Sequence, residues 1–135
     1  MRFRIVGVLI LGLAGTGAGC RERPKLLTAH GKPVEHWLGQ LRQPNPAERR
    51  QAVKVLGGVG KADPAVLPGL IEAVRDTDPA VRSEAVLALL RIGPDAREAV
   101  PALTEAQADP DPTVRAQAAK ALERIQGGNW TPLRP

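Results

Sequence analysis

The sequence predicts an all-α fold, a three-unit α-solenoid in which antiparallel helix pairs stack on one another. Three observations support this prediction. The sequence of residues 34–126 repeats itself without a gap at one fixed offset, which is the separation between Pro46 and Pro79. Within each unit, apolar side chains recur at the spacing of an amphipathic helix. The chain has one Phe, two Trp and no Tyr, and its many small aliphatic residues suit closely packed helices better than a β-sandwich.

Four residue types mark the repeat, because each recurs at the same place in every unit. Pro and Arg lie at the start of each predicted second helix, and Ala and Leu lie on its buried side. The aligned sets are Pro46, Pro79 and Pro112; Arg49, Arg82 and Arg115; Ala52, Ala85 and Ala118; and Leu56, Leu89 and Leu122. We therefore expect three units, residues 34–60, 64–93 and 97–126, each made of two helices.

The first 19 residues have the order of a secretory signal peptide. A basic start, Met1 to Arg4, precedes the apolar core IVGVLILGLA and a run of small residues. Even when extended to Cys20, the apolar stretch is about 16 residues long, which is shorter than the ~20 that cross a bilayer as a helix. We interpret residues 1–19 as an export signal.

Cys20, the single cysteine, directly follows these small residues. Its placement resembles the signal of bacterial lipoproteins, in which such a cysteine is acylated and becomes the first residue of the mature chain. That signal usually has Leu three residues before the cysteine, where this chain has Gly17. The resemblance implies a lipid anchor on Cys20 and a place in the cell envelope, facing the periplasm or the exterior. The alternative is ordinary cleavage near Ala18.

Two segments flank the repeats. Residues 20–33 contain the lipid-anchor cysteine, four cations, one anion and two prolines without apolar periodicity, so we expect a flexible basic linker. Residues 127–135 form a C-terminal tail, in which Trp130 either covers the last repeat or anchors a partner. Trp37 lies on the apolar side of the first predicted helix, and we expect it to close the open end of the stack.

The second helix of each unit is predicted to begin at an Asn-Pro or Asp-Pro pair. The side chains of Asn45, Asp78 and Asp111 can cap the first backbone N–H groups, and Pro fits the first helical position because its missing N–H costs nothing there. Gly60 and Gly93 are expected to end the first two of these helices.

These motifs resemble the HEAT repeat family, including its short bacterial forms. The segments RDTDPAVRSEAVLALLRIG (75–93) and ADPDPTVRAQAAKALERIQ (108–126) match its pattern of an Asp, a Pro-capped turn, Val-Arg, and Ala and Leu up to the helix end. The segment QPNPAERRQAVKVLGGVG (43–60) departs from it at Gln43 and Glu48. The resemblance implies stacked antiparallel helix pairs and a role in protein interaction.

The resemblance also implies that the recurring Arg pairs with an Asp of its own or the adjoining repeat and forms a structural ladder. Bidentate Arg–carboxylate pairs suit such partly buried contacts, so we prefer this interpretation to a basic stripe that binds an acidic ligand. Arg49 has no matching acid in its own unit because Gln43 stands there. The pairs that fit are Asp76 with Arg82 and Asp109 with Arg115.

No catalytic, metal or cofactor site is expected. The Asp-x-Asp pairs at 76/78 and 109/111 suit helix capping better than calcium binding, which needs more oxygen ligands. His30 and His36 have no further ligand at metal-site spacing. The only serine, Ser83, has no histidine in its own or the following unit, so neither a nucleophile–base pair nor a small-molecule substrate is predicted. Action on bilin chromophores, which the resemblance would allow, is not expected.

The charge of +5 lies mainly outside the repeats, because residues 34–126 hold 12 Lys or Arg and 13 Asp or Glu. Nucleic-acid binding needs cations gathered on a folded face, so it is not expected. Residues 34–62 hold five cations and two anions, whereas residues 63–126 hold seven cations and eleven anions. This gradient predicts that the distal units face a soluble partner of basic character, with Glu84 and Glu98 at the contact.

Together these features predict a non-catalytic protein-protein interaction or scaffold module, exported and anchored to the membrane by lipid on Cys20. The expected partner is a protein of unknown identity. The alternative is an accessory subunit of an enzyme or of a larger envelope assembly.

Overall fold

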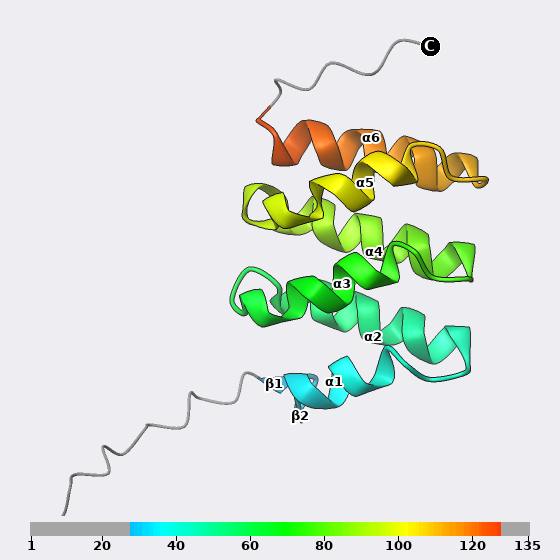
Figure 1. Ribbon diagram of the computed structural model, residues 1–135. Helices are drawn as coiled ribbons and strands as arrows, with labels where there is room; N and C mark the ends of the chain where they lie inside the picture. Colours follow the sequence, from blue (N-terminus) through cyan, green and yellow to red (C-terminus); the bar gives the residue numbers. More distant parts are fainter. Residues whose placement is uncertain (1–27, 128–135) are drawn as a thin grey trace, which may run out of the picture.

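A computed structural model of the protein describes residues 28–127 (Figure 1). The elements follow the order β1 (Thr28–Ala29), β2 (Lys32–Pro33), α1 (Val34–Gln40), α2 (Pro46–Val59), η1 (Pro64–Val66), α3 (Leu67–Ala73), α4 (Pro79–Ile92), η2 (Gly93–Ala99), α5 (Val100–Ala106) and α6 (Pro112–Ile125). The predicted export signal at 1–19, the lipid site Cys20 and the tail beyond residue 127 lie outside the described residues.

The helices form two layers, which confirms the predicted all-α solenoid (Figure 1). The second helices of the three units, α2, α4 and α6, pack directly on one another. The first helices, α1, α3 and α5, each pack mainly on the second helix of their own unit. Among residues 28–127, no helix is long and apolar enough to cross a membrane.

The second helices begin where the sequence places a capping residue before proline. Asn45 Oδ1 accepts a hydrogen bond from the Ala47 N–H at 3.0 Å. Asp78 Oδ1 accepts bonds from two N–H groups of α4, at 2.9 and 3.1 Å, and Asp111 Oδ1 does the same in α6, at 2.7 and 3.2 Å. Each cap satisfies N–H groups that have no partner inside the helix, which fixes the first turn of all three helices.

One aliphatic core runs through the three units. In each second helix the repeated leucine is fully buried, and the first helices α3 and α5 contribute a matching leucine. These residues are Leu56, Leu70, Leu89, Leu103 and Leu122. At Gly57 the packing of α2 on α4 leaves no room for a side chain, because an added Cβ would lie 2.6 Å from Ala88 Cβ. The helices therefore approach closely at this point.

Residues 28–33 correct part of the predicted flexible linker, because they form an antiparallel hairpin that belongs to the folded unit. His30 (φ 52°) and Gly31 (φ 73°) form a two-residue turn of left-handed backbone, the conformation that tight hairpins need. Ala29 is only 6% exposed, and its carbonyl accepts a hydrogen bond from Trp37 Nε1 at 2.8 Å. Strands of two residues show no alternating pattern, which is why the sequence did not reveal them.

Candidate functional site

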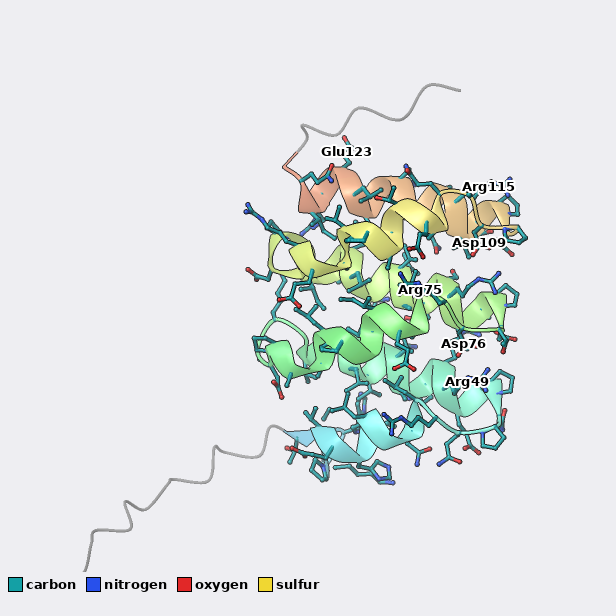
Figure 2. The ribbon with its side chains drawn as sticks, viewed as in Figure 1. Arg49, Arg75, Asp76, Asp109, Arg115 and Glu123 are labelled. Carbon is teal, nitrogen blue, oxygen red and sulfur yellow. The ribbon has the colours of Figure 1, made fainter. Side chains whose placement is uncertain are left out.

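The arginine ladder joins neighbouring units rather than residues of one unit. Arg49 donates from Nε and Nη2 to the two carboxylate oxygens of Asp76, both at 2.8 Å. Arg82 holds Asp109 in the same way, at 2.7 and 2.9 Å. Both pairs are largely shielded from solvent, with side chains 8–15% exposed. Each rung is therefore a bidentate bond between consecutive repeats. Arg49 and Asp76, the partners of the first rung, are labelled in Figure 2.

The within-unit pairs expected from the sequence, Asp76 with Arg82 and Asp109 with Arg115, do not form a side-chain bond. Each Arg instead uses Nη1 to bind two backbone carbonyls of the turn before its own helix; for Arg115 these are the Asp109 and Pro110 carbonyls, at 2.8 and 3.0 Å. The Asp of that turn faces the preceding unit. Arg49, whose own unit has Gln43 in place of the turn Asp, is thus paired, while Arg115 has no ion pair among the residues that the structure describes.

The ladder changes the acidity of its carboxyl groups. Desolvation is the largest single influence on Asp76 and would raise its pKa, but the hydrogen bonds from Arg49 and from the Asp78 N–H, together with the positive charges nearby, outweigh it. The pKa of Asp76 is therefore lowered. The pKa of Asp109 is lowered by the same balance, with Arg82 as the donor. Both carboxyl groups therefore take up a proton at a lower pH than an ordinary aspartate does.

The two helix layers differ in charge. The first helices α1, α3 and α5 contain three Glu and neither Lys nor Arg, whereas α2, α4 and α6 contain eight Lys or Arg and three Glu. We call the outward side of α2, α4 and α6 the second-helix face. Its residues include Arg50, Lys54, Leu87, Leu90, Arg91, Lys120 and Arg124. A count along the chain hides this separation, because each unit contributes to both layers.

Glu84, which the charge gradient placed at a contact with a basic partner, is largely buried. It is only 9% exposed, and its Oε1 lies 3.2 Å from Arg91 Nη2. A partner of basic character could reach Glu98, which is exposed, but not Glu84 without breaking this ion pair. The two acids also lie on different elements, α4 and η2. Glu84 is therefore not an exposed, unpaired acid, and the distal contact expected from the charge gradient stays a prediction.

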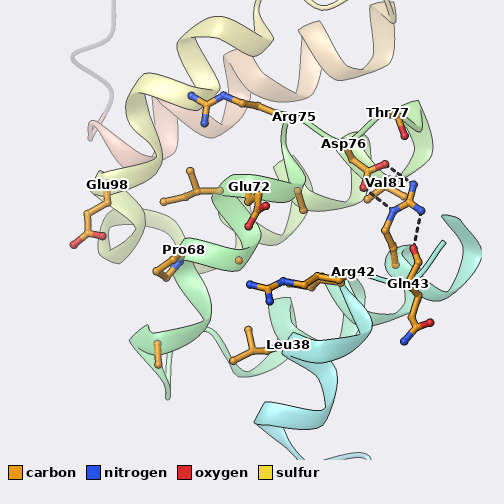
Figure 3. A pocket seen from close by; sticks show the side chains of 16 residues that line it. Leu38, Arg42, Gln43, Pro68, Glu72, Arg75, Asp76, Thr77, Val81 and Glu98 are labelled. Atoms are coloured by element: carbon orange, nitrogen blue, oxygen red, sulfur yellow. Dashed lines mark hydrogen bonds and ion pairs between the residues drawn. The ribbon is translucent and has the colours of Figure 1, made fainter. Parts of the chain in front are cut away.

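A groove of about 1060 Å³ lies on the other side of the stack, between α1 and α3 (Figure 3). Leu38, Leu41 and Ile71 are among its apolar lining residues, and Arg42 and Glu72 are among its charged ones. One unit further along, Arg75 and Glu105 stand at the equivalent positions of Arg42 and Glu72 and form an exposed ion pair at 2.9 Å. This pair was not predicted from the sequence, although the same two positions carry Arg and Glu in consecutive units.

The polar residues considered for chemistry have structural partners. Ser83 Oγ donates to Gln117 Oε1 at 2.8 Å, which links α4 to α6. His30 and His36 place their ring centroids 6.3 and 5.3 Å from that of Trp37, in edge arrangements at the hairpin end of the stack. Within residues 28–127 there is no cluster of three or more His, Cys, Asp or Glu that could hold a metal ion.

Comparisons with known proteins agree with this architecture. A model of HEAT repeats matches residues 34–123. The chain is similar to the structure of the complex of CpcE and CpcF of phycocyanin lyase from Nostoc sp., with a TM-score of 0.62 and 28% identity over 74% of this chain and 41% of that chain. It is also similar to a designed armadillo repeat protein in complex with the peptide (KR)4, with a TM-score of 0.60 and 20% identity over 68% of this chain and 46% of the other.

An engineered protein gives a TM-score of 0.60 and 24% identity over 72% of this chain and 47% of that chain, and with the armadillo protein it shows the fold alone. The chain spans less than half the length of these solved chains. No curated protein matches it. The match to HEAT repeats covers the helices of all three units up to the last turn of α6, and the helix pairs, caps and ladder described above follow the same period. The chain belongs to the HEAT repeat family.

Proposed function

We propose that the protein is a non-catalytic protein-interaction module, exported and anchored to the membrane by lipid on Cys20. The observation that carries this proposal is the ladder-joined stack. Its recurring polar residues hold the units together. The outward sides of the first-helix layer and of the second-helix layer can therefore carry side chains that are specific to this chain. Such faces are the surfaces that helical repeat proteins offer to partners.

The hydroxyl groups of Ser83 in α4 and Thr104 in α5 make structural hydrogen bonds, which supports a binding role over catalysis. Ser83 is engaged with Gln117, and Thr104 Oγ1 donates to the Val100 carbonyl at 2.8 Å within its own helix. Neither hydroxyl contacts a histidine or a carboxylate that could activate it as a nucleophile.

Site-specific photo-crosslinking in the native host tests the binding function. A photoreactive amino acid is placed at Leu87 on the second-helix face or at Leu38 in the groove, with Lys61 in an exposed turn as the control position. We expect a discrete adduct with another protein from Leu87 or Leu38 and none from Lys61. Equal, diffuse labelling from all three positions, or no adduct at all, would contradict a protein-binding role.

The anchor is tested by Cys20→Ser, with Gly17→Leu as the matched control. The first change removes the thiol that lipid would occupy, and the second restores the residue usual in lipoprotein signals. We expect Cys20→Ser to abolish incorporation of labelled fatty acid and to release the protein from the membrane fraction. Gly17→Leu should be labelled at least as strongly as the natural chain. An unlabelled natural chain that begins near residue 19 would refute the anchor.

A second candidate function is that of an accessory subunit, and the similarity to the phycocyanin lyase complex favours it. The chain would then support an enzyme's reaction through a protein contact rather than perform the reaction itself. Copurification with an enzyme whose turnover rises when the purified chain is added back would support this role. A bilin added to the purified chain alone should leave its absorbance unchanged; a spectral shift would point to a chromophore site of its own.

A further inference from the structure

We propose that the second-helix face binds an extended acidic segment of a partner protein, with an apolar side chain of that segment seated between its carboxylates. This inference rests on the proposed protein-binding function and names the chemical class of the partner. Its first support is the separation of charge between the two layers of helices, since α1, α3 and α5 contain no Lys or Arg whereas α2, α4 and α6 contain eight.

Several cations on this face are not neutralised by the fold. The ladder uses Arg49 and Arg82, and Arg91 shares its charge with Glu84. Four others, Arg50, Lys54, Lys120 and Arg124, are exposed and have no carboxylate within 4.0 Å among residues 28–127. Their charges are therefore available to a ligand, and they come from α2 and α6, at the two sides of the face.

The centre of the face is apolar. Lys54, Leu87 and Lys120 occupy the same position in the three successive units, so Leu87 lies between the two lysines across the layer. Leu87 and its neighbour Leu90 are both partly exposed. Helix axes in contact lie ~8–10 Å apart, so α2 and α6 are separated by roughly 16–20 Å. An extended chain covers this span with about six residues.

This pattern favours a protein segment over other anions. Base stacking on nucleic acid uses aromatic side chains, and α2, α4 and α6 contain none. Glu123 stands among the cations of α6 and would repel a ligand whose negative charges are evenly spaced along its whole length, as those of a nucleic acid are. An acidic peptide can instead place its carboxylates at the two cationic sides and an apolar side chain over Leu87.

Fluorescence polarisation with the labelled peptide Glu-Glu-Ser-Leu-Ser-Glu-Glu tests the proposal on the full chain in a non-ionic detergent. The variant Lys54→Glu/Lys120→Glu reverses the two sides of the face. The control Lys61→Glu/Arg97→Glu changes the net charge equally, at exposed residues outside the second helices. A further variant, Leu87→Ser, removes the apolar centre, and circular dichroism checks the folding of each variant.

We expect the Lys54/Lys120 variant to weaken binding by at least about tenfold and the control pair to weaken it by less than about threefold. Salt should weaken binding to the natural chain as it rises from about 50 mM to about 0.5 M. Leu87→Ser should also weaken binding while leaving its salt dependence unchanged.

Equal losses in the reversal and control variants would overturn the proposal. So would tighter binding of single-stranded DNA, or of vesicles containing phosphatidylglycerol, than of the peptide. A crosslinked partner that contacts Leu38 but not Leu87 would overturn this inference while leaving the protein-binding function intact.

Discussion

The ladder predicts that two equivalent arginines contribute unequally to stability. Arg82 and Arg115 share the same position in successive units, and each donates Nη1 to two carbonyls of the turn before its helix. Only Arg82 also holds a carboxylate among the described residues, that of Asp109. Replacing each by Met removes the shared contacts in both cases, so the difference between the two variants isolates the rung between units.

The expected size follows from the burial of that rung. Hydrogen bonds to charged groups contribute about 1.5–3 kcal/mol, whereas breaking a fully buried ion pair costs about 3–5 kcal/mol. Since the side chains of Arg82 and Asp109 are 15% and 8% exposed, we expect Arg82→Met to lower the free energy of unfolding by about 2–3 kcal/mol. Arg115→Met, at an exposed residue, should cost less than about 1 kcal/mol. Urea unfolding followed by far-UV circular dichroism near neutral pH measures both.

Lowering the pH tests the same assignment with the same two variants, Arg82→Met and Arg115→Met. The pKa of Asp109 is lower in the folded chain than in the unfolded chain, so its rung stabilises the fold above its ordinary pKa of about 3.9. This contribution is lost as the pH falls from that value through the lowered folded pKa. The gap between Arg82→Met and Arg115→Met should therefore narrow on acidification. Equal losses near neutral pH, or a gap that persists when Asp109 is protonated, would refute the assignment of the rung.

Three other substitutions test the packing. Leu89→Ala removes a fully buried side chain from the central unit and should lower the free energy of unfolding by about 2–5 kcal/mol in a urea titration. Gly57→Ala should destabilise the chain because its Cβ has no room against α4, whereas Gly58→Ala, which faces open space, should raise the melting temperature because Ala favours helix over Gly. Trp37→Phe removes the hydrogen bond to the Ala29 carbonyl and should increase proteolysis at the hairpin while α4 and α6 keep their hydrogen-exchange protection.

The helices could be predicted from the sequence because their signals are local. An Asp before Pro supplies a cap whose acceptor lies close in sequence to its donors, so Asp78 and Asp111 are recognisable without any tertiary information. The repeat then shows each local signal once in every unit, which also identifies the buried leucines.

The partners of the ladder could not be predicted in the same way, because they lie in different units and depend on how one unit is placed on the next. Arg49 shows the difficulty. Its own unit has Gln43 where the others have Asp, so the sequence offers no matching acid within that unit, yet Arg49 holds Asp76 of the following unit. The hairpin before α1 could not be predicted for a similar reason. Its first strand is held by contacts with the helices that follow, through the hydrogen bond from Trp37 to the Ala29 carbonyl and through packing on α2.

The same geometry decides how charge should be counted in a stack of this kind. A balanced count over residues 34–126 argues against an electrostatic ligand only if the charges are mixed on the surface. Here every first helix lies in one layer and every second helix lies in the other. A small excess of positive charge in the second helix of each unit therefore adds up along the second-helix face. Lys54 and Lys120, which belong to the first and the last unit, thereby flank one row across three helices. The chemical class of a partner therefore has to be inferred separately for each layer. The second-helix face, with its unneutralised cations and its apolar centre, is complementary to an acidic segment that carries an apolar side chain.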